Sequence, residues 1–267
     1  MPKESLNQFA VVTGASSGIG LELAKQFANH GFDLLVTAES ESIEHRAVEL
    51  RALGARVSTV RADLRTYEGV EKLWSAIEAE GRPLDAIAIN AGVGVGGAFA
   101  DNDLQRELDL IRLNVISVVH LAKRVVQDMM KRNEGRILFT ASIAAEMPGP
   151  FEAVYAASKA FVLSFAEAIR NELKDTRITV TALQPGATET NFFHRAGMDD
   201  TKVGQSSKSN PADVARKGYE AMLAGKDHVV AATLKERVLA AAAIVTPEPM
   251  KAEQHRKMAE PGSGSNG

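Results

Sequence analysis

The chain has 267 residues, with 31 Lys or Arg against 34 Asp or Glu, so its formal net charge is −3. This balance lacks the basic excess that a nucleic-acid partner requires, and 45% hydrophobic residues are typical of a globular protein with a core. The absence of cysteine excludes disulfides, thiolate metal sites and a catalytic thiol, and it suits the reducing cytoplasm.

Residues 1–5 lack the apolar core of a signal peptide, and no apolar run approaches the roughly 18 residues of a membrane span. The six histidines are scattered, without a metal-binding spacing. We therefore expect a cytoplasmic protein with no metal, no membrane partner and no nucleic-acid partner.

Short apolar runs alternate with helical patterns along the chain. The runs that predict strands are 9–12, 33–36, 56–60, 86–89, 136–139, 178–183 and 228–231. The patterns that predict helices are 18–30, 42–53, 68–80, 103–132, 152–174 and 211–224. Nearly unbroken apolar strands are expected in a parallel sheet that helices cover on both faces. The alternation predicts an α/β fold of Rossmann type, a doubly wound parallel sheet of about seven strands.

No linker interrupts this pattern, so residues 1–260 are expected to form a single domain, followed by a flexible tail at 261–267. Residues 194–210 are polar and are expected to form a long loop. Together with Phe192 and Phe193, this segment is predicted to act as a lid over the active site. A polar segment that buries little apolar surface opens readily.

A glycine-rich run, Thr13-Gly14-Ala15-Ser16-Ser17-Gly18-Ile19-Gly20, connects the first predicted strand to the first predicted helix. Backbone N–H groups and the positive end of the helix dipole bind a pyrophosphate at such a junction. Glycine allows the close approach of the backbone and the positive φ that some positions need. An ordinary turn can also be rich in glycine, but the placement between strand and helix favours a dinucleotide site.

This run resembles the cofactor loop of the short-chain dehydrogenase/reductase (SDR) family, and further motifs similar to those of the family follow in order. Asp63-Leu64 ends the third strand, where the resemblance implies that Asp63 holds the adenine amino group. Asn90-Ala91-Gly92 is similar to the Asn-Asn-Ala-Gly motif of the family, with Ile89 in place of the first asparagine. Pro185-Gly186 is similar to the turn that packs against the nicotinamide. The resemblance covers residues 7 to about 191.

The resemblance assigns a set of residues to the cofactor, which we expect to be NAD, with NADP as the alternative. This set is Gly14, Ser16, Ser17, Gly18, Ile19, Gly20, Glu39, Asp63, Leu64, Asn90, Ala91, Gly92, Tyr155, Lys159, Pro185, Gly186, Thr188 and Thr190.

The expected preference for NAD depends on the residues after the second strand, where the adenosine ribose binds. Family members that use NADP usually carry an arginine just after this strand or beside the second glycine of the loop. Glu39, Ser40 and Ser17 take these positions here, and Glu39 would repel a 2′-phosphate. The aspartate typical of NAD users is replaced by Ala38, however, and Arg46 is close enough in sequence to reach a phosphate.

Tyr155 and Lys159 are four residues apart in a predicted helix, so their side chains lie on one face. A nearby ammonium favours ionisation of a phenol whose ordinary pKa is about 10, and Tyr155 could then exchange a proton with an alcohol or carbonyl. Ser142, at the end of the fifth strand, could donate to the substrate oxygen. Asn114 shares a helix face with apolar residues, so its amide is predicted to be buried and hydrogen-bonded.

These four residues match the Asn-Ser-Tyr-Lys tetrad of the family, and the resemblance implies that Asn114 holds a water that links Lys159 to solvent. The pattern predicts an NAD(P)-dependent oxidoreductase that interconverts a secondary alcohol and a ketone. Dehydratase or epimerase chemistry on the same fold, and a dinucleotide-sensing regulator without turnover, are the alternatives.

The residues expected to surround the substrate are mostly apolar, which favours a hydrophobic alcohol or ketone. They are 93–95, 144–147, Phe151, Val154, Phe192 and Phe193. Wide apolar arcs on the helices at 103–132 and 152–174 predict a homo-oligomer, a dimer or a tetramer.

Overall fold

A seven-stranded parallel sheet forms the centre of the computed structural model, which describes residues 7–233, Glu236 and 246–264. The strands are β1 (Phe9–Thr13), β2 (Asp33–Ala38), β3 (Val57–Arg61), β4 (Ala86–Ile89), β5 (Glu134–Thr140), β6 (Arg177–Pro185) and β7 (His228–Ala231). Their order is β3-β2-β1-β4-β5-β6-β7, and every neighbouring pair is parallel. The predicted fold class is confirmed. The direction of winding reverses between β1 and β4, which is where ligands bind in open α/β sheets.

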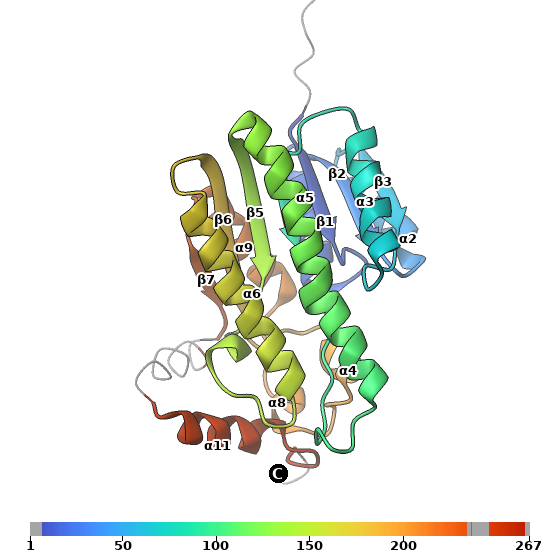
Figure 1. Ribbon diagram of the computed structural model, residues 1–267. Helices are drawn as coiled ribbons and strands as arrows, with labels where there is room; N and C mark the ends of the chain where they lie inside the picture. Colours follow the sequence, from blue (N-terminus) through green and yellow to red (C-terminus); the bar gives the residue numbers. More distant parts are fainter. Residues whose placement is uncertain (1–6, 234–235, 237–245, 265–267) are drawn as a thin grey trace, which may run out of the picture.

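Helices cover both faces of the sheet (Figure 1). One face packs against α3 (Tyr67–Ala79), α5 (Ser117–Arg132) and α6 (Ala153–Glu172). The other packs against α1 (Gly18–Asn29), α2 (Ser42–Arg51) and α9 (Pro211–Leu223). Successive strand residues point to opposite faces, so Val11 belongs to the first core and Val12 to the second.

The predicted helix at 103–132 is interrupted by a change of helical type. It consists of α4 (Leu104–Ile111), a π-helical turn (Arg112–Ile116) and α5. Such turns widen a helix locally and occur often at functional sites. This one contains Asn114, the buried amide singled out from the sequence.

The expectation of a long loop at 194–210 is wrong. The segment contains the short helices α7 (Phe192–Ala196) and α8 (Lys202–Gln205). Its residues Ala196, Met198 and Thr201 are each only 1% exposed. Ala196 and Met198 pack with Phe193 in a small apolar cluster. The segment therefore buries apolar surface of its own, contrary to the reasoning that predicted a readily opened lid.

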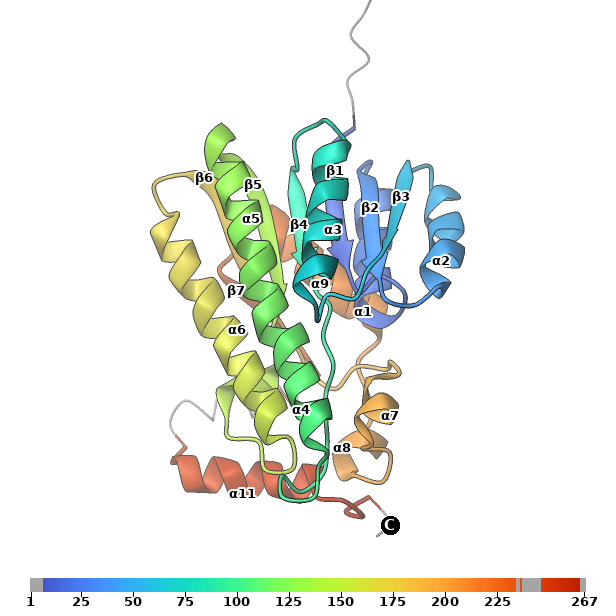
Figure 2. The same ribbon diagram turned by 45° about the vertical axis from the view of Figure 1, so that its right-hand side comes forward.

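A helix that the sequence analysis did not predict, α11 (Glu248–Ala259), lies with α7 and α8 beyond the carboxyl ends of the strands (Figures 1 and 2). In the residues that follow α11, the N–H of Gly262 donates to Asp200 Oδ2 at 2.8 Å. The N–H of Gly264 donates to the carbonyl oxygen of Asp200 at 2.9 Å. These hydrogen bonds involve the start of the expected tail. Residues 265–267, like residues 1–6 of the expected domain, lie outside the described residues.

Candidate active site

A cavity of about 630 Å³ opens at the carboxyl ends of the strands. Every residue predicted to bind the cofactor lines it, and so does Ser142. Asn114 lies behind the wall of this cavity. The structure thus brings residues that are up to 176 positions apart in the sequence, from Gly14 to Thr190, to one surface.

The glycine loop can close only because its glycines lack side chains. Gly14 and Gly18 have φ values of 69° and 55°, the left-handed region that favours glycine. A Cβ on Gly20 would lie 2.2 Å from the carbonyl oxygen of Gly14. Ser17, the N-cap of α1, makes no side-chain capping hydrogen bond within the described part of the chain. The first turn of α1 therefore offers N–H donors to an anion, and the loop fits a pyrophosphate.

Asn90 joins three strands beneath this loop. Its Nδ2 donates to the carbonyl oxygen of Thr13 at 3.1 Å, and its Oδ1 accepts from Thr140 Oγ1 at 3.1 Å. The hydroxyl of Thr13 in turn accepts from the N–H groups of Asn90 and Ala91, both at 2.9 Å. These bonds hold the ends of β1, β4 and β5 together at the floor of the cavity.

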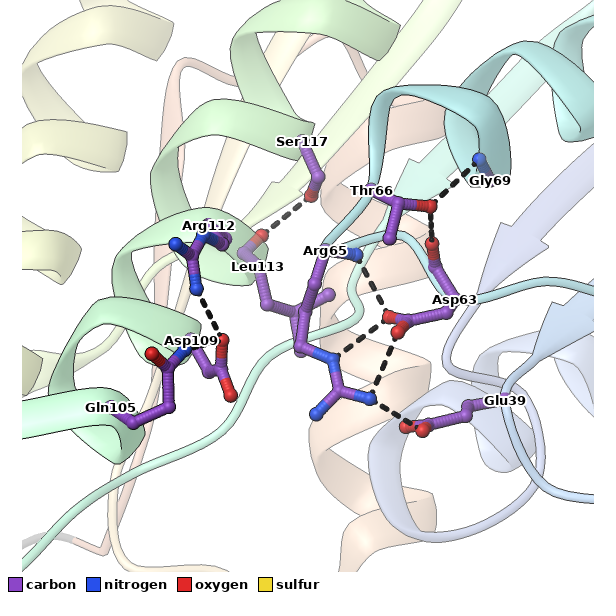
Figure 3. Close-up of polar contacts among 10 residues, drawn as sticks. All are labelled: Glu39, Asp63, Arg65, Thr66, Gly69, Gln105, Asp109, Arg112, Leu113 and Ser117. Atoms are coloured by element: carbon purple, nitrogen blue, oxygen red, sulfur yellow. Dashed lines mark hydrogen bonds and ion pairs between the residues drawn. The ribbon is translucent and has the colours of Figure 1, made fainter. Parts of the chain in front are cut away.

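At the adenosine end, the structure reveals an arginine that the sequence analysis missed. Figure 3 shows Arg65 between the carboxylates of Asp63 and Glu39. Its Nε and Nη2 donate to the two oxygens of Asp63 at 2.8 and 2.9 Å, and Nη2 also donates to Glu39 Oε1 at 2.5 Å. Hydrogen bonding by Arg65 holds the pKa of Asp63 below its usual value. Because Arg65 follows Leu64 directly, its position in the sequence was a usable signal.

The loop is also contacted by the second arginine considered from the sequence. Arg46 Nε donates to the carbonyl oxygen of Ser16 at 3.2 Å, while its Nη1 pairs with Glu49 at 2.5 Å. Arg46 thus reaches the glycine loop.

At the other end of the cavity, α6 carries Tyr155 and Lys159, which are 9% and 6% exposed. Lys159 Nζ donates to the carbonyl oxygen of Thr140 at 2.9 Å, and burial lowers the pKa of Lys159 to about 8. Burial raises the pKa of Tyr155 well above its usual value, and the nearby carboxylate of Glu152 raises it further. A hydrogen bond with Ser142 acts in the opposite direction. Burial is therefore the dominant influence on the pKa of Tyr155, whereas the sequence analysis considered nearby positive charge and not burial.

The π-helical turn places the amide of Asn114 between two segments of the site. Its Oδ1 accepts from the N–H of Val93 at 3.0 Å, and its Nδ2 donates to the carbonyl oxygen of Val93 at 2.9 Å and to Ser158 Oγ at 3.0 Å. A Cβ on Gly92 would lie 3.2 Å from Asn114 Oδ1 and 3.3 Å from Lys159 Nζ. Glycine at position 92 therefore lets both side chains lie close to the backbone there.

Further polar residues of the cavity were not found from the sequence. Glu236 accepts from the N–H of Ala187 at 2.8 Å, directly after the Pro185-Gly186 turn. Glu152, the N-cap residue of α6, and His255 on α11 also line the cavity. Glu236 and His255 lie outside the motifs that guided the sequence analysis, so no local signal identified them.

The family model described as short chain dehydrogenase matches residues 8–201. The chain belongs to this family. Oxidoreductase UcpA of Salmonella typhimurium is 35% identical over 207 residues, which are 77% of this chain and 76% of the relative. The 1-deoxy-11-beta-hydroxypentalenate dehydrogenase of Streptomyces exfoliatus is 34% identical over 217 residues, 80% of this chain and 78% of the relative.

Solved structures of short-chain dehydrogenases agree with this assignment. One from Burkholderia phymatum in complex with NAD has a TM-score of 0.81 and 25% identity, and the match covers 96% of this chain and 97% of that one. One from Sphingobium yanoikuyae in complex with NADPH has a TM-score of 0.76 and 28% identity, with 84% and 87% covered. Within the described residues, no helix is long and apolar enough to span a membrane.

The buried lysine predicts a specific pH dependence of stability. Because the pKa of Lys159 is about 8 in the folded chain and about 10.4 when unfolded, its burial costs stability at low pH, and this cost disappears as the pH rises above 8. Between about pH 7 and pH 9.5, the free energy of unfolding should therefore rise by about 2 kcal/mol relative to that of Lys159→Met. Urea unfolding of both proteins across this range measures the difference. Parallel curves would show that Lys159 titrates normally.

Proposed function

We propose that this short-chain dehydrogenase interconverts a secondary alcohol and a ketone with a nicotinamide dinucleotide as the hydride acceptor or donor. The observation that carries the proposal is the meeting of Ser142, Tyr155 and Lys159 in one cavity with the glycine loop. The cofactor that the family implies fits this cavity, since Gly14 and Gly18 leave backbone room and α1 offers uncapped N–H donors. When bound, it would take up or release the hydride at the carbon that carries the oxygen.

The chain's own residues handle the proton and the substrate oxygen. In oxidation, Tyr155 takes the proton of the substrate hydroxyl as the hydride leaves the carbon atom that carries this hydroxyl. In reduction, Tyr155 returns a proton to the carbonyl oxygen. Ser142 donates to the substrate oxygen as negative charge develops there. Lys159 stabilises the phenolate with its positive charge. We assign Asn114 the role of holding a water that connects Lys159 to solvent.

The substrate end of the cavity supports a hydrophobic alcohol or ketone. It is lined by apolar side chains that come from four separate parts of the chain: Val93, Ala144, Met147, Phe192, Phe193 and Met258. Tyr155 packs against Phe192 with ring centroids 5.1 Å apart. A panel of secondary alcohols (2-octanol, cyclohexanol and 1-phenylethanol) and the matching ketones, assayed by the absorbance of reduced nicotinamide, tests the reaction class.

Tyr155→Phe should abolish turnover and leave cofactor binding almost unchanged, because the substitution removes only the hydroxyl. Loss of a general acid–base group lowers the rate by about 10²–10⁴-fold. The measurements are kcat on the best alcohol of the panel and the dissociation constant of the reduced cofactor by fluorescence titration. A variant that kept more than roughly a tenth of the wild-type rate would exclude Tyr155 from this role.

We further propose that NAD(H) is preferred over NADP(H). Glu39, Asp63 and Arg65 together carry one net negative charge at the adenosine end, which disfavours a 2′-phosphate. Arg65 offsets part of the charge of Glu39, so the preference should be moderate. The opposite outcome would implicate Arg46 or Arg65 in phosphate binding.

In fluorescence titrations, NADH should bind about tenfold more tightly than NADPH, since a partly exposed charge pair contributes about 1 kcal/mol or slightly more. Glu39→Arg should reverse the order, and Glu39→Gln should bring the two affinities closer together. Tighter binding of NADPH by the unmodified protein would refute the assignment.

A homo-oligomer is our proposal for the assembly. α6 lies beside the continuous helical run that α4, the π-helical turn and α5 form (Figures 1 and 2), and these elements expose several large apolar side chains: Leu104, Leu108, Ile116, Val119 and Phe161. Exposed apolar groups gathered on one surface are typical of an interface, and two-fold symmetry is the common solution.

Light scattering at micromolar concentration should give the mass of two or four chains. The double variant Ile116→Glu/Phe161→Glu should lower that mass, whereas a monomeric wild-type protein would contradict the proposal.

A further inference from the structure

The C-terminal helix α11 brings a titratable pair into the catalytic cavity. His255 on α11 and Glu152, the N-cap residue of α6, both line the cavity that contains Tyr155. The two side chains are only 11% and 7% exposed, and His255 Nε2 lies 3.4 Å from Glu152 Oε2. In the part of the chain that the structure describes, the Glu152 carboxylate makes its polar side-chain contact with His255.

The second ring nitrogen of His255 determines which hydrogens the pair needs. His255 Nδ1 lies 3.1 Å from the carbonyl oxygen of Pro150. A carbonyl can only accept, so Nδ1 carries the hydrogen of this bond. A neutral imidazole would then turn the bare lone pair of Nε2 toward the carboxylate, which is repulsive. The contact is attractive only if one further proton lies between His255 and Glu152, and an imidazolium beside a carboxylate meets this condition.

The charge of this pair matters because Glu152, the N-cap residue of α6, is three residues before Tyr155. The two side chains line the same buried space, and the Glu152 carboxylate raises the pKa of Tyr155. A phenolate at Tyr155 and an uncompensated carboxylate at Glu152 would be like charges in that space, and each would oppose the ionisation of the other. Among the described residues, Lys159, Ser142, Arg195 and Glu236 also line this cavity, and Ser142 hydrogen-bonds to Tyr155.

The backbone before Glu152 is held in place by the same helix. Phe151 has a φ of 64°, which is rare for a bulky residue and persists only where the surroundings impose it. Its carbonyl oxygen accepts from the N–H of Gly97 at 2.9 Å, and the guanidinium of Arg256 lies 5.2 Å from the centre of its ring. α11 therefore contacts Pro150, Phe151 and Glu152 in succession, through His255 and Arg256. This arrangement directs the Glu152 carboxylate toward His255.

We propose that His255 is a positioning residue: it supplies the proton that neutralises Glu152 and thereby allows Tyr155 to ionise beside it. The inference rests on the proposed role of Tyr155 as acid and base. The shared proton remains on the pair throughout the reaction and is not transferred to the substrate. The C-terminal helix is thus part of the acid–base apparatus, although α11 begins 93 residues after Tyr155 in the sequence.

Four proteins test this proposal: the wild type, His255→Gln, Glu152→Gln and the double variant. The charge of the pair is zero in the wild type, in Glu152→Gln and in the double variant, and −1 only in His255→Gln. We expect the rising limb of kcat/KM for alcohol oxidation to move to higher pH by about one unit in His255→Gln alone. At a fixed pH below the midpoint, this shift is a roughly tenfold loss. The other three profiles should coincide.

Lys257→Gln is the matched control, since it removes a neighbouring positive charge from an exposed position of α11 that pairs with Glu253 and not with Glu152. Its profile should not move. A second measurement needs no turnover: the alkaline rise of tyrosinate absorbance, taken for each protein as the difference from its own Tyr155→Phe counterpart, should also move to higher pH only in His255→Gln.

Two results would overturn the inference. One is a His255→Gln profile with a lower rate but an unchanged midpoint, which would mean that His255 only anchors the helix. The other is a double variant that keeps the shift of His255→Gln, since the effect would then not pass through Glu152. Failure of the proposed function is recognised separately, by full turnover of Tyr155→Phe. If Tyr155→Phe is inactive and all midpoints coincide, this inference alone fails.

Discussion

The burial of Tyr155 and Lys159 is the constraint on which the rest of the site depends. Both groups are removed from water, so the pKa of the tyrosine is raised and that of the lysine is lowered to about 8. Each shift disfavours the ion that proton transfer needs. The surrounding groups reduce this penalty, because Thr140 accepts from the lysine and Ser142 hydrogen-bonds to the tyrosine. The end of β5 and the residues directly after it therefore supply both groups that reduce this penalty.

The sheet and its covering helices could be predicted from the sequence, because burial on both faces leaves strands such as Phe9–Thr13 almost wholly apolar. The segment 192–210 was misjudged for the opposite reason. Its many polar residues suggested a loop, but Ala196 and Met198 suffice to anchor it against Phe193. α11 was missed because it has few apolar residues and buries only Lys251 and Ala259. A helix that buries so few of its residues leaves a weak periodic pattern.

The residues of the candidate site also fall into those that the sequence predicted and those that it did not. Motif residues such as Gly14, Gly20 and Asn90 could be placed in advance, because their roles depend on the turn between adjacent elements. Sequence reasoning failed where a charge is compensated across the fold, since the sequence does not show which distant charges meet. Arg65 pairs with Glu39, which is 26 residues away in the sequence, and His255 near the far end of the chain pairs with Glu152.

These two pairs have the same physical role, which is to compensate the charge of a carboxylate. At each end of the cavity, a carboxylate adds negative charge to the site: Glu39 lies beside Asp63 at the expected adenosine end, and Glu152 lies near the phenolate that Tyr155 would form. In both places a basic side chain from another element compensates that carboxylate. The compensation differs in kind, however. Arg65 is always charged, so it sets a fixed balance at the adenosine end, whereas histidine carries its charge only with a proton. At the catalytic end, the compensation therefore depends on the proton that His255 and Glu152 share, whereas at the adenosine end it depends on a permanent charge.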